Sequence, residues 1–88
     1  MSLTLLTRAG CSLCRVAHTE LTRICADLGV DFDEVDVDRK AADGDPALRA
    51  EFGDRLPVVL LDGEEHSYWE VDEPRLRADL AARPGAGG

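Results

Sequence analysis

A Cys-x-x-Cys motif, Cys11-Ser12-Leu13-Cys14, lies where a strand-like segment gives way to a helical pattern. The preceding segment, Ser2 to Leu6, is short and rich in strand formers. From Cys14 to Leu28 apolar residues recur at steps of three and four, which predicts an amphipathic helix that stops before Gly29. A dithiol at such a strand-to-helix junction is typical of a redox site.

The middle of the chain predicts a second strand and a second helix. Side chains alternate from Asp33 to Val37, which places Val35 and Val37 on one face of a strand. Asp45-Pro46 has the residue types that favour a helix cap and a first helical position, and Gly53 closes the segment that follows. We therefore expect a short helix between Pro46 and Gly53.

The last third of the chain predicts a hairpin and a final helix. Val58 to Leu61 is a continuous apolar run, and Asp62-Gly63 is typical of a two-residue hairpin turn. Glu64 to Trp69 then alternates enough to return as an antiparallel strand. Asp72 or Glu73 is the expected cap of a last helix.

The predicted order is strand, helix, strand, helix, strand, strand, helix, which is an α/β arrangement. A right-handed crossover makes the first two strands parallel. A chain of 88 residues can bury one modest core. We therefore expect one domain over residues 1–83, followed by a flexible tail, 84–88, that is rich in proline and glycine.

Charge and hydropathy exclude several classes of partner. The chain has 10 basic and 18 acidic residues, a formal net charge of -8 that repels nucleic acid and anionic lipid. No stretch approaches the roughly 18 apolar residues of a membrane span, and Met1 to Leu6 lacks the features of a signal peptide. We expect a cytoplasmic monomer that binds neither nucleic acid nor membrane.

The element order, the early dithiol and the segment Arg55-Leu56-Pro57-Val58 together resemble the glutaredoxin branch of the thioredoxin superfamily, in particular small bacterial glutaredoxin-like proteins. The resemblance covers Ser2 to about Arg83. It implies a thioredoxin-like fold, with a four-stranded mixed sheet, three helices and helices on both faces of the sheet.

The catalytic residues expected from the motif are Cys11 and Cys14. Backbone N–H groups at the helix start and the positive end of the helix dipole favour a thiolate at Cys11, with the N–H groups of Leu13 and Cys14 as donors. Arg8 and Arg15 add positive charge nearby. Cys14, one turn into the helix, would resolve the mixed disulfide formed between Cys11 and a substrate.

The resemblance also implies a set of substrate-binding residues. In the family, the proline equivalent to Pro57 is cis and packs beside the dithiol; an ordinary trans proline at a strand start is the alternative. The residue before it, here Leu56, offers its backbone to an extended substrate. Arg8 matches a basic residue three positions before the first cysteine, which favours an anionic thiol ligand. Ser12 and Leu13 complete the expected set.

The segment Tyr68-Trp69-Glu70-Val71-Asp72 differs from the glycine pair that usually holds glutathione in this family. The two carboxylates in it would repel a glutathione carboxylate, so this segment argues against tight glutathione binding. Strand alternation places one of the two aromatic rings in the core, and the other either lines the substrate groove or is simply exposed.

Dithiol exchange with protein disulfides is the main prediction, with a reductase or glutathione as the electron donor and no tightly bound cofactor. Three alternatives remain: a glutathione-dependent glutaredoxin, a non-catalytic binding module on a thioredoxin fold, and metal or iron–sulfur carriage through Cys11.

Cys25 is expected to pack in the core, three helical turns beyond Cys14. His18 is expected at the surface, because Cys25 is too far from it to share a zinc ion.

Overall fold

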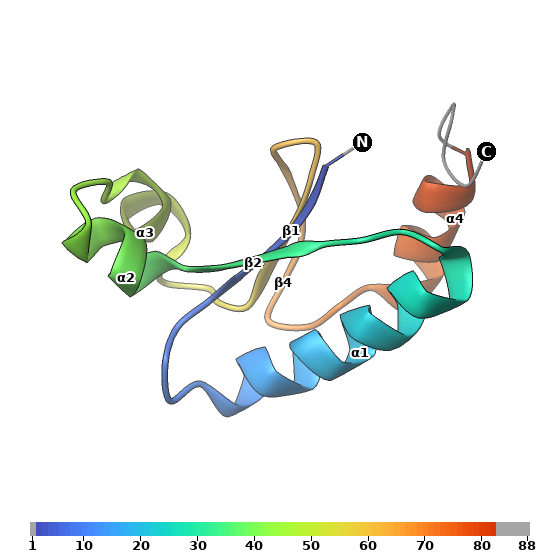
Figure 1. Ribbon diagram of the computed structural model, residues 1–88, viewed down its shortest axis with the longest axis horizontal. Coiled ribbons are helices and arrows are strands. Elements are labelled where there is room, and N and C mark those ends of the chain that lie inside the picture. Colours follow the sequence, from blue (N-terminus) through green and yellow to red (C-terminus); the bar gives the residue numbers. More distant parts are fainter. Residues whose placement is uncertain (1, 83–88) are drawn as a thin grey trace.

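A mixed four-stranded sheet with the order β2-β1-β3-β4 forms the centre of the molecule (Figure 1). The computed structural model describes residues 2–82. The central strand β1 (Leu3–Thr7) pairs in parallel with β2 (Asp33–Asp36) and antiparallel with β3 (Val58–Leu61). The hairpin partner of β3 is β4 (Glu64–Tyr68), at the other edge of the sheet. The predicted parallel and antiparallel pairings are confirmed.

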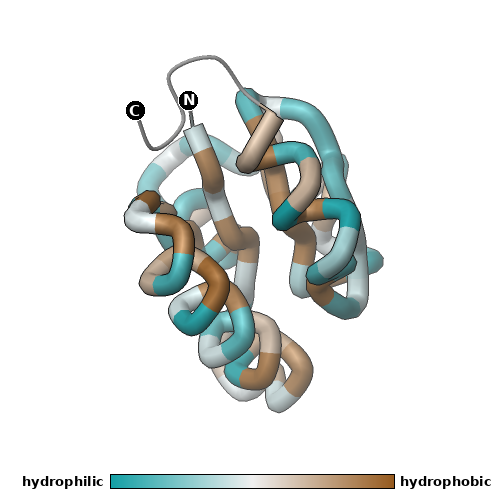
Figure 2. The backbone as a smooth tube through the Cα atoms, turned by 90° about the vertical axis from the view of Figure 1, so that its right-hand side faces the viewer, coloured by the Kyte–Doolittle hydropathy of each residue, from teal (hydrophilic) through white to brown (hydrophobic). Residues whose placement is uncertain are grey.

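Helices cover both faces of the sheet. The long helix α1 (Ser12–Leu28) contacts the C-terminal helix α4 (Glu73–Ala82), and Figure 1 shows both away from the two short helices. Those short helices, α2 (Val37–Ala42) and α3 (Ala47–Phe52), contact each other. Figure 2 shows hydrophobic and hydrophilic stretches alternating along the helices, as expected where one face of each helix packs on the sheet.

Two apolar clusters pack against opposite faces of the sheet. Leu5 and Leu6 are both fully buried and point to opposite faces, because side chains alternate along a strand. The cluster with Leu5 includes residues of α1, β3 and α4: Leu3, Ala17, Leu21, Ile24, Cys25, Val59, Leu61, Val71, Leu76 and Leu80. The cluster with Leu6 lies on the face covered by α2 and α3. It contains one residue from each of these helices and two from β3: Val37, Phe52, Val58 and Leu60.

The prediction of three helices is wrong, because α2 is a fourth helix that begins at Val37, the last residue of the expected strand, and continues to Ala42, where no element was expected. The strand ends at Asp36, whose carboxylate accepts hydrogen bonds from the backbone N–H groups of Asp38 and Arg39 at 3.0 and 3.1 Å. This is a side-chain N-cap, which starts a helix directly after the strand. Val37 is therefore the first helical residue, although it is fully buried as an inward-facing valine should be.

The second expected helix, α3, begins one residue later than predicted. Pro46 occupies the cap position and Ala47 is the first helical residue, whereas Asp45 was the expected cap. The Asp45 carboxylate still accepts a hydrogen bond from the N–H of Ala47, at 3.4 Å. Gly53 ends this helix with an ordinary right-handed φ of -62°.

The ends of α1 and the hairpin turn follow the sequence prediction. Gly29 ends α1 with φ +68°, in the left-handed region where glycine carries no steric penalty. Asp62 and Gly63 have φ of 53° and 83°, and Leu61 pairs directly with Glu64, which defines a two-residue turn of the I′ kind. A register shift follows between Val59 and Leu60.

The expectation that one ring of the Tyr68-Trp69 pair is buried is wrong. Trp69 lies just past the end of β4 with φ +68°, so strand alternation no longer sets the direction of its side chain. Tyr68 and Trp69 are 49% and 58% exposed, and their rings form an edge-to-face pair with centroids 5.0 Å apart.

At the C-terminal end, Asp72 caps α4 by accepting a hydrogen bond from the N–H of Arg75 at 3.3 Å, as one of the two expected caps. The tail predicted over 84–88 lies outside the described residues. Within residues 2–82, no helix combines the length and the apolar character needed to cross a membrane.

Candidate active site

The two motif cysteines are joined by a disulfide bond at the start of α1. The Cα atoms of Cys11 and Cys14 are 5.2 Å apart, close to the mode of about 5.5–6 Å for disulfides. Cys11 is the N-cap residue of α1, with extended backbone at φ -96° and ψ 107°. Its Sγ accepts a hydrogen bond from the backbone N–H of Cys14 at 3.1 Å. The motif can therefore close a bridge without disturbing the helix.

The two sulfurs differ in how far they are exposed. Cys14 faces the core and is 3% exposed, whereas Cys11 is half-buried at the mouth of the strand-to-helix turn. A substrate sulfur can therefore approach Cys11 but not Cys14. Of the two expected N–H donors to Cys11, Cys14 makes the bond, and within the described chain Leu13 makes none.

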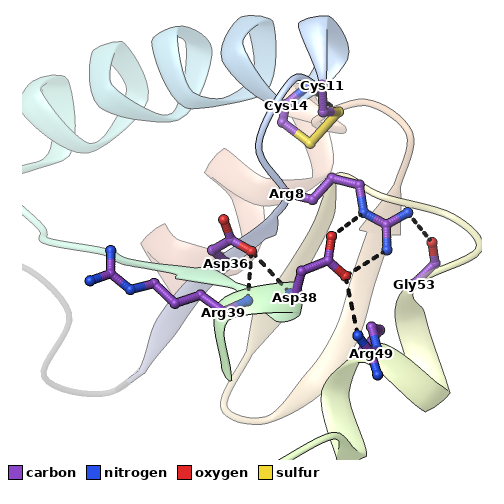
Figure 3. A network of polar contacts seen from close by, with 8 residues as sticks. All are labelled: Arg8, Cys11, Cys14, Asp36, Asp38, Arg39, Arg49 and Gly53. Atoms are coloured by element: carbon purple, nitrogen blue, oxygen red, sulfur yellow. Dashed lines mark hydrogen bonds and ion pairs between the residues drawn. A yellow bond between two sulfur atoms is a disulfide. The ribbon is translucent and has the colours of Figure 1, made fainter. Parts of the chain in front are cut away.

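The side chain of Arg8 extends from the turn before the disulfide toward α2 and α3 (Figure 3). Its Nε and Nη2 atoms donate to the two carboxylate oxygens of Asp38, each at 3.0 Å. Its Nη1 atom donates to the carbonyl oxygen of Gly53 at 3.3 Å. Arg49 approaches the same carboxylate at 3.9 Å. All three guanidinium nitrogens of Arg8 thus have partners inside the protein.

Sequence reasoning did not identify Asp38 as a residue of the site. Asp38 lies beyond the predicted strand, in a segment for which no element was predicted, so no helix was expected to present a carboxylate to Arg8. The spacing of Asp36 from the two N–H groups it caps is the one local signal for α2. Gly53 was singled out only as a helix stop, and its carbonyl bond to Arg8 is a tertiary contact.

A groove of about 650 Å³ opens beside the disulfide, on the side where β2 ends. Cys11, Arg8 and two further arginines, Arg15 and Arg39, lie along it. Neither Arg15 nor Arg39 forms an ion pair with another of the described residues. Within residues 2–82, Arg15 and Arg39 are thus the unpaired arginines of this groove, which Glu34 and Asp36 line as well.

The Leu56-Pro57 peptide bond is cis, and Pro57 is fully buried at the start of β3. The carbonyl oxygen of Pro57 accepts a hydrogen bond from the N–H of Trp69 at 2.8 Å, which ties the exposed aromatic pair to this turn. Ser12 and Leu13 are both exposed in the first turn of α1. The other substrate-binding residue expected here, Leu56, is half-buried.

Cys25, on α1, is a free thiol that packs in the hydrophobic core and is 4% exposed. Burial, with a smaller contribution from the charge of Asp31, raises the pKa of this thiol. His18 is on the surface of α1, with its ring edge-on to Phe32 at 5.4 Å and its Nε2 atom 3.8 Å from Glu34. Among residues 2–82, no cluster of three or more His, Cys, Asp or Glu side chains is placed to hold a metal ion.

Comparison with known proteins identifies the family. Residues 2–81 match the model of the glutaredoxin-like domain (DUF836). An uncharacterized protein of Mycobacterium tuberculosis is 64% identical over 77 residues, which cover 88% of this chain and 79% of that protein.

Solved structures agree in fold. The protein XcR50 of X. campestris is 38% identical with a TM-score of 0.66, covering 94% of this chain and 100% of that one. The glutaredoxin-like protein NrdH-redoxin of Escherichia coli is 31% identical with a TM-score of 0.54, covering 96% and 100%. Thioredoxin 1 of Thermosipho africanus, at 18% identity and a TM-score of 0.63 over 92% and 91%, shares the fold alone. The fold is thioredoxin-like, as the sequence predicts.

Proposed function

Because this chain belongs to the glutaredoxin-like domain family, we propose that it is a thiol–disulfide oxidoreductase in which Cys11 attacks and Cys14 resolves. The observation that supports this most directly is the asymmetric disulfide at the start of α1. Cys11 is accessible and caps the helix, while Cys14 is buried one turn behind it. Such a pair can exchange with an outside sulfur at one atom only.

The exchange proceeds in two displacement steps when the protein acts as a reductant. The Cys11 thiolate attacks one sulfur of a substrate disulfide, and the other substrate sulfur leaves as a thiolate. Cys14 then loses its proton and attacks Sγ of Cys11, which releases the second substrate sulfur. Two electrons pass to the substrate, which becomes a dithiol, and the protein ends in the disulfide form described above. An external dithiol reverses the cycle.

The start of α1 favours the thiolate form of Cys11. The N–H of Cys14 donates to its sulfur, which caps the N-terminus of a 17-residue helix, the positive end of the helix dipole. The helix dipole contributes about 0.3 to 1 kcal/mol at an exposed position, which is less than one pKa unit at about 1.36 kcal/mol per unit. A pKa shift of Cys11 larger than about one unit would therefore need direct hydrogen bonds to its thiolate.

We propose that the substrates are protein disulfides. The protein would act on them as a monomer in the cytoplasm and take electrons from a reductase or a small thiol. NrdH-redoxin, the glutaredoxin-like protein at 31% identity, is described as having a thioredoxin-like activity profile. Arg8 donates its hydrogen bonds within the protein, to Asp38 and Gly53. In addition, the carboxylates of Glu70 and Asp72 would repel a glutathione carboxylate. These features favour a polypeptide over glutathione as the preferred partner.

Cysteine variants test this proposal. The reduced protein should reduce a model protein disulfide such as insulin with dithiothreitol as the electron source, and Cys11→Ser should abolish this activity. Cys14→Ser should instead accumulate a mixed disulfide with substrate, visible as an adduct in intact-mass measurement. Cys25→Ala serves as the matched control and should keep full activity. Equal activity in Cys11→Ser and the wild type would refute the proposal.

A further inference from the structure

Large exposed hydrophobic side chains in the described chain are confined to two segments near the redox pair. Leu13 and Val16, in the first turns of α1, are 55% and 54% exposed, and Tyr68 and Trp69 follow at the end of β4. Single exposed rings are ordinary, but these two rings contact each other edge to face, and a backbone hydrogen bond to Pro57 holds the main chain of Trp69. The arrangement is that of a preformed contact surface.

The two segments belong to one continuous surface. Leu13, Val16 and Glu20 are spaced by three and four residues, so they lie along one face of α1, starting beside Cys14. Glu20 lines the same groove, of about 860 Å³, as Tyr68 and Glu70. Figure 1 likewise shows the chain after β4 running close to α1. The surface therefore extends from the redox pair along α1 to the aromatic pair.

The groove carries two carboxylates without an ion pair among the described residues. Five carboxylates line it, against the guanidinium of Arg23; they are Glu20, Glu65, Glu70, Asp72 and Glu73. Glu65 and Glu73 are neutralised by arginines, and Asp72 lies 3.8 Å from Arg75. Glu20 and Glu70 form no ion pair within residues 2–82. Glu70 directly follows the aromatic pair in the chain, and Glu20 lines the same groove as Tyr68. Aromatic faces and carboxylates both attract cations.

The floor of the groove has a second feature that suits a ligand with polar backbone groups. His66 and Ser67 line it, and the side chain of His66 is only 6% exposed. Nδ1 of His66 and Oγ of Ser67 are buried and have no hydrogen-bond partner among the described residues. Polar atoms in this state are uncommon in folded proteins, and they are usually satisfied by a bound water, an ion or a ligand group.

We propose that this surface, formed by Leu13, Val16, Glu20, Tyr68, Trp69 and Glu70, binds a polypeptide segment that carries lysine or arginine next to its redox cysteine. The proposal rests on the proposed exchange function and adds the chemistry of the preferred substrate. The apolar stripe of α1 contacts the aliphatic part of the segment, and the cation lies between the aromatic pair and the two unpaired carboxylates. Charge complementarity selects a basic segment over an acidic one.

Matched peptide disulfides test this selection. The probes are disulfide-linked dimers of one short peptide in which the residues flanking cysteine are lysine, glutamine or glutamate. The rate of oxidation of the reduced protein, followed by quenching and intact mass, should decrease in that order. At low ionic strength the lysine peptide should react about tenfold faster than the glutamate peptide, and salt should reduce this ratio.

Charge variants separate the surface from the overall negative charge of the protein. Glu20→Gln combined with Glu70→Gln should bring the lysine and glutamate peptides to within about twofold of each other. Asp43→Asn combined with Glu51→Gln removes the same charge outside the groove and should preserve the selectivity. Trp69→Ala should slow the lysine peptide more than the glutamine peptide.

A small uncharged disulfide, hydroxyethyl disulfide, distinguishes failure of this inference from failure of the proposed function. It should react at the same rate with the wild type and with all three variants, because it reaches Cys11 without using the groove. If it reacts normally while the three peptides react equally, or while both charge variants lose selectivity alike, the basic-segment inference is wrong. If the reduced wild type reacts with no disulfide at all, the exchange function itself is wrong.

Discussion

The guanidinium of Arg8 and the carboxylate of Asp38 form a two-point ion pair, with both N···O distances at 3.0 Å. This pair joins the turn before the redox motif to helix α2, and the Gly53 carbonyl occupies the remaining nitrogen of Arg8. The arginine three residues before the motif is thus neutralised within the protein. A bidentate geometry of this kind is the strongest form of surface ion pair.

Removing the charge of Asp38 should make the redox site more reactive toward anionic small disulfides. In Asp38→Asn the guanidinium loses its charged partner, so it can stabilise both the Cys11 thiolate and an incoming carboxylate. The reduced variant should react with glutathione disulfide about threefold or more faster than the wild type, measured by intact mass. Asp43→Asn, with the same charge change at the exposed end of α2, should leave this rate unchanged. A slower reaction in Asp38→Asn would contradict this role.

Two leucines of α1 should differ sharply in their contribution to stability. Leu21 is fully buried in the cluster beneath α1, whereas Leu13 is 55% exposed. Leu21→Ala should lower the free energy of unfolding by about 2 to 5 kcal/mol, because it leaves a cavity as well as losing apolar burial. Leu13→Ala should change it by less than about 0.5 kcal/mol. Urea denaturation followed by circular dichroism measures both, and equal losses would argue against the described packing.

Glu73 should make stability depend on acid pH. Hydrogen bonds from Arg23 and Arg77 lower the pKa of this carboxyl to about 2 in the folded state, from its usual value of 4.5. The unfolded chain therefore binds the proton first as pH falls, so the stabilisation is complete above about pH 4.5 and is lost toward pH 2. The difference in Tm between wild type and Glu73→Gln should shrink across this interval.

The matched control for that measurement is Glu64→Gln, because Glu64 is exposed and has no ion pair within the described chain. Its Tm should follow the wild type at every pH. A gap between wild type and Glu73→Gln that stays constant down to pH 2 would show that the carboxyl is not held by the two arginines.

The Cys25 thiol should be unreactive toward alkylating reagents in the folded protein. Its burial at 4% exposure and its raised pKa both keep the thiol protonated and out of reach. Iodoacetamide should modify the oxidised native protein slowly and modify it rapidly once urea unfolds the chain, with mass spectrometry as the readout. Rapid labelling of the native protein would mean that this part of α1 opens readily, contrary to its packing.

The sequence alone determined the parts of this protein that depend on local signals. The Cys-x-x-Cys motif, the apolar period of α1 with its glycine stop, and the Asp62-Gly63 turn are each set by neighbouring residues, so the order of strands and the redox pair could be predicted. Local pattern failed at Val37, because a buried valine satisfies both strand alternation and the first turn of a helix.

Only the tertiary structure decided how the surroundings of the motif are arranged. Arg8 meets Asp38 and Gly53, which are 30 and 45 residues away in the chain, and no spacing rule predicts such a contact. The outward direction of Trp69 follows from its left-handed backbone and its bond to Pro57, not from strand alternation. Residues far apart in the chain together form the surface that a substrate meets. Its charge and shape are therefore set only when the folded sheet brings these segments together.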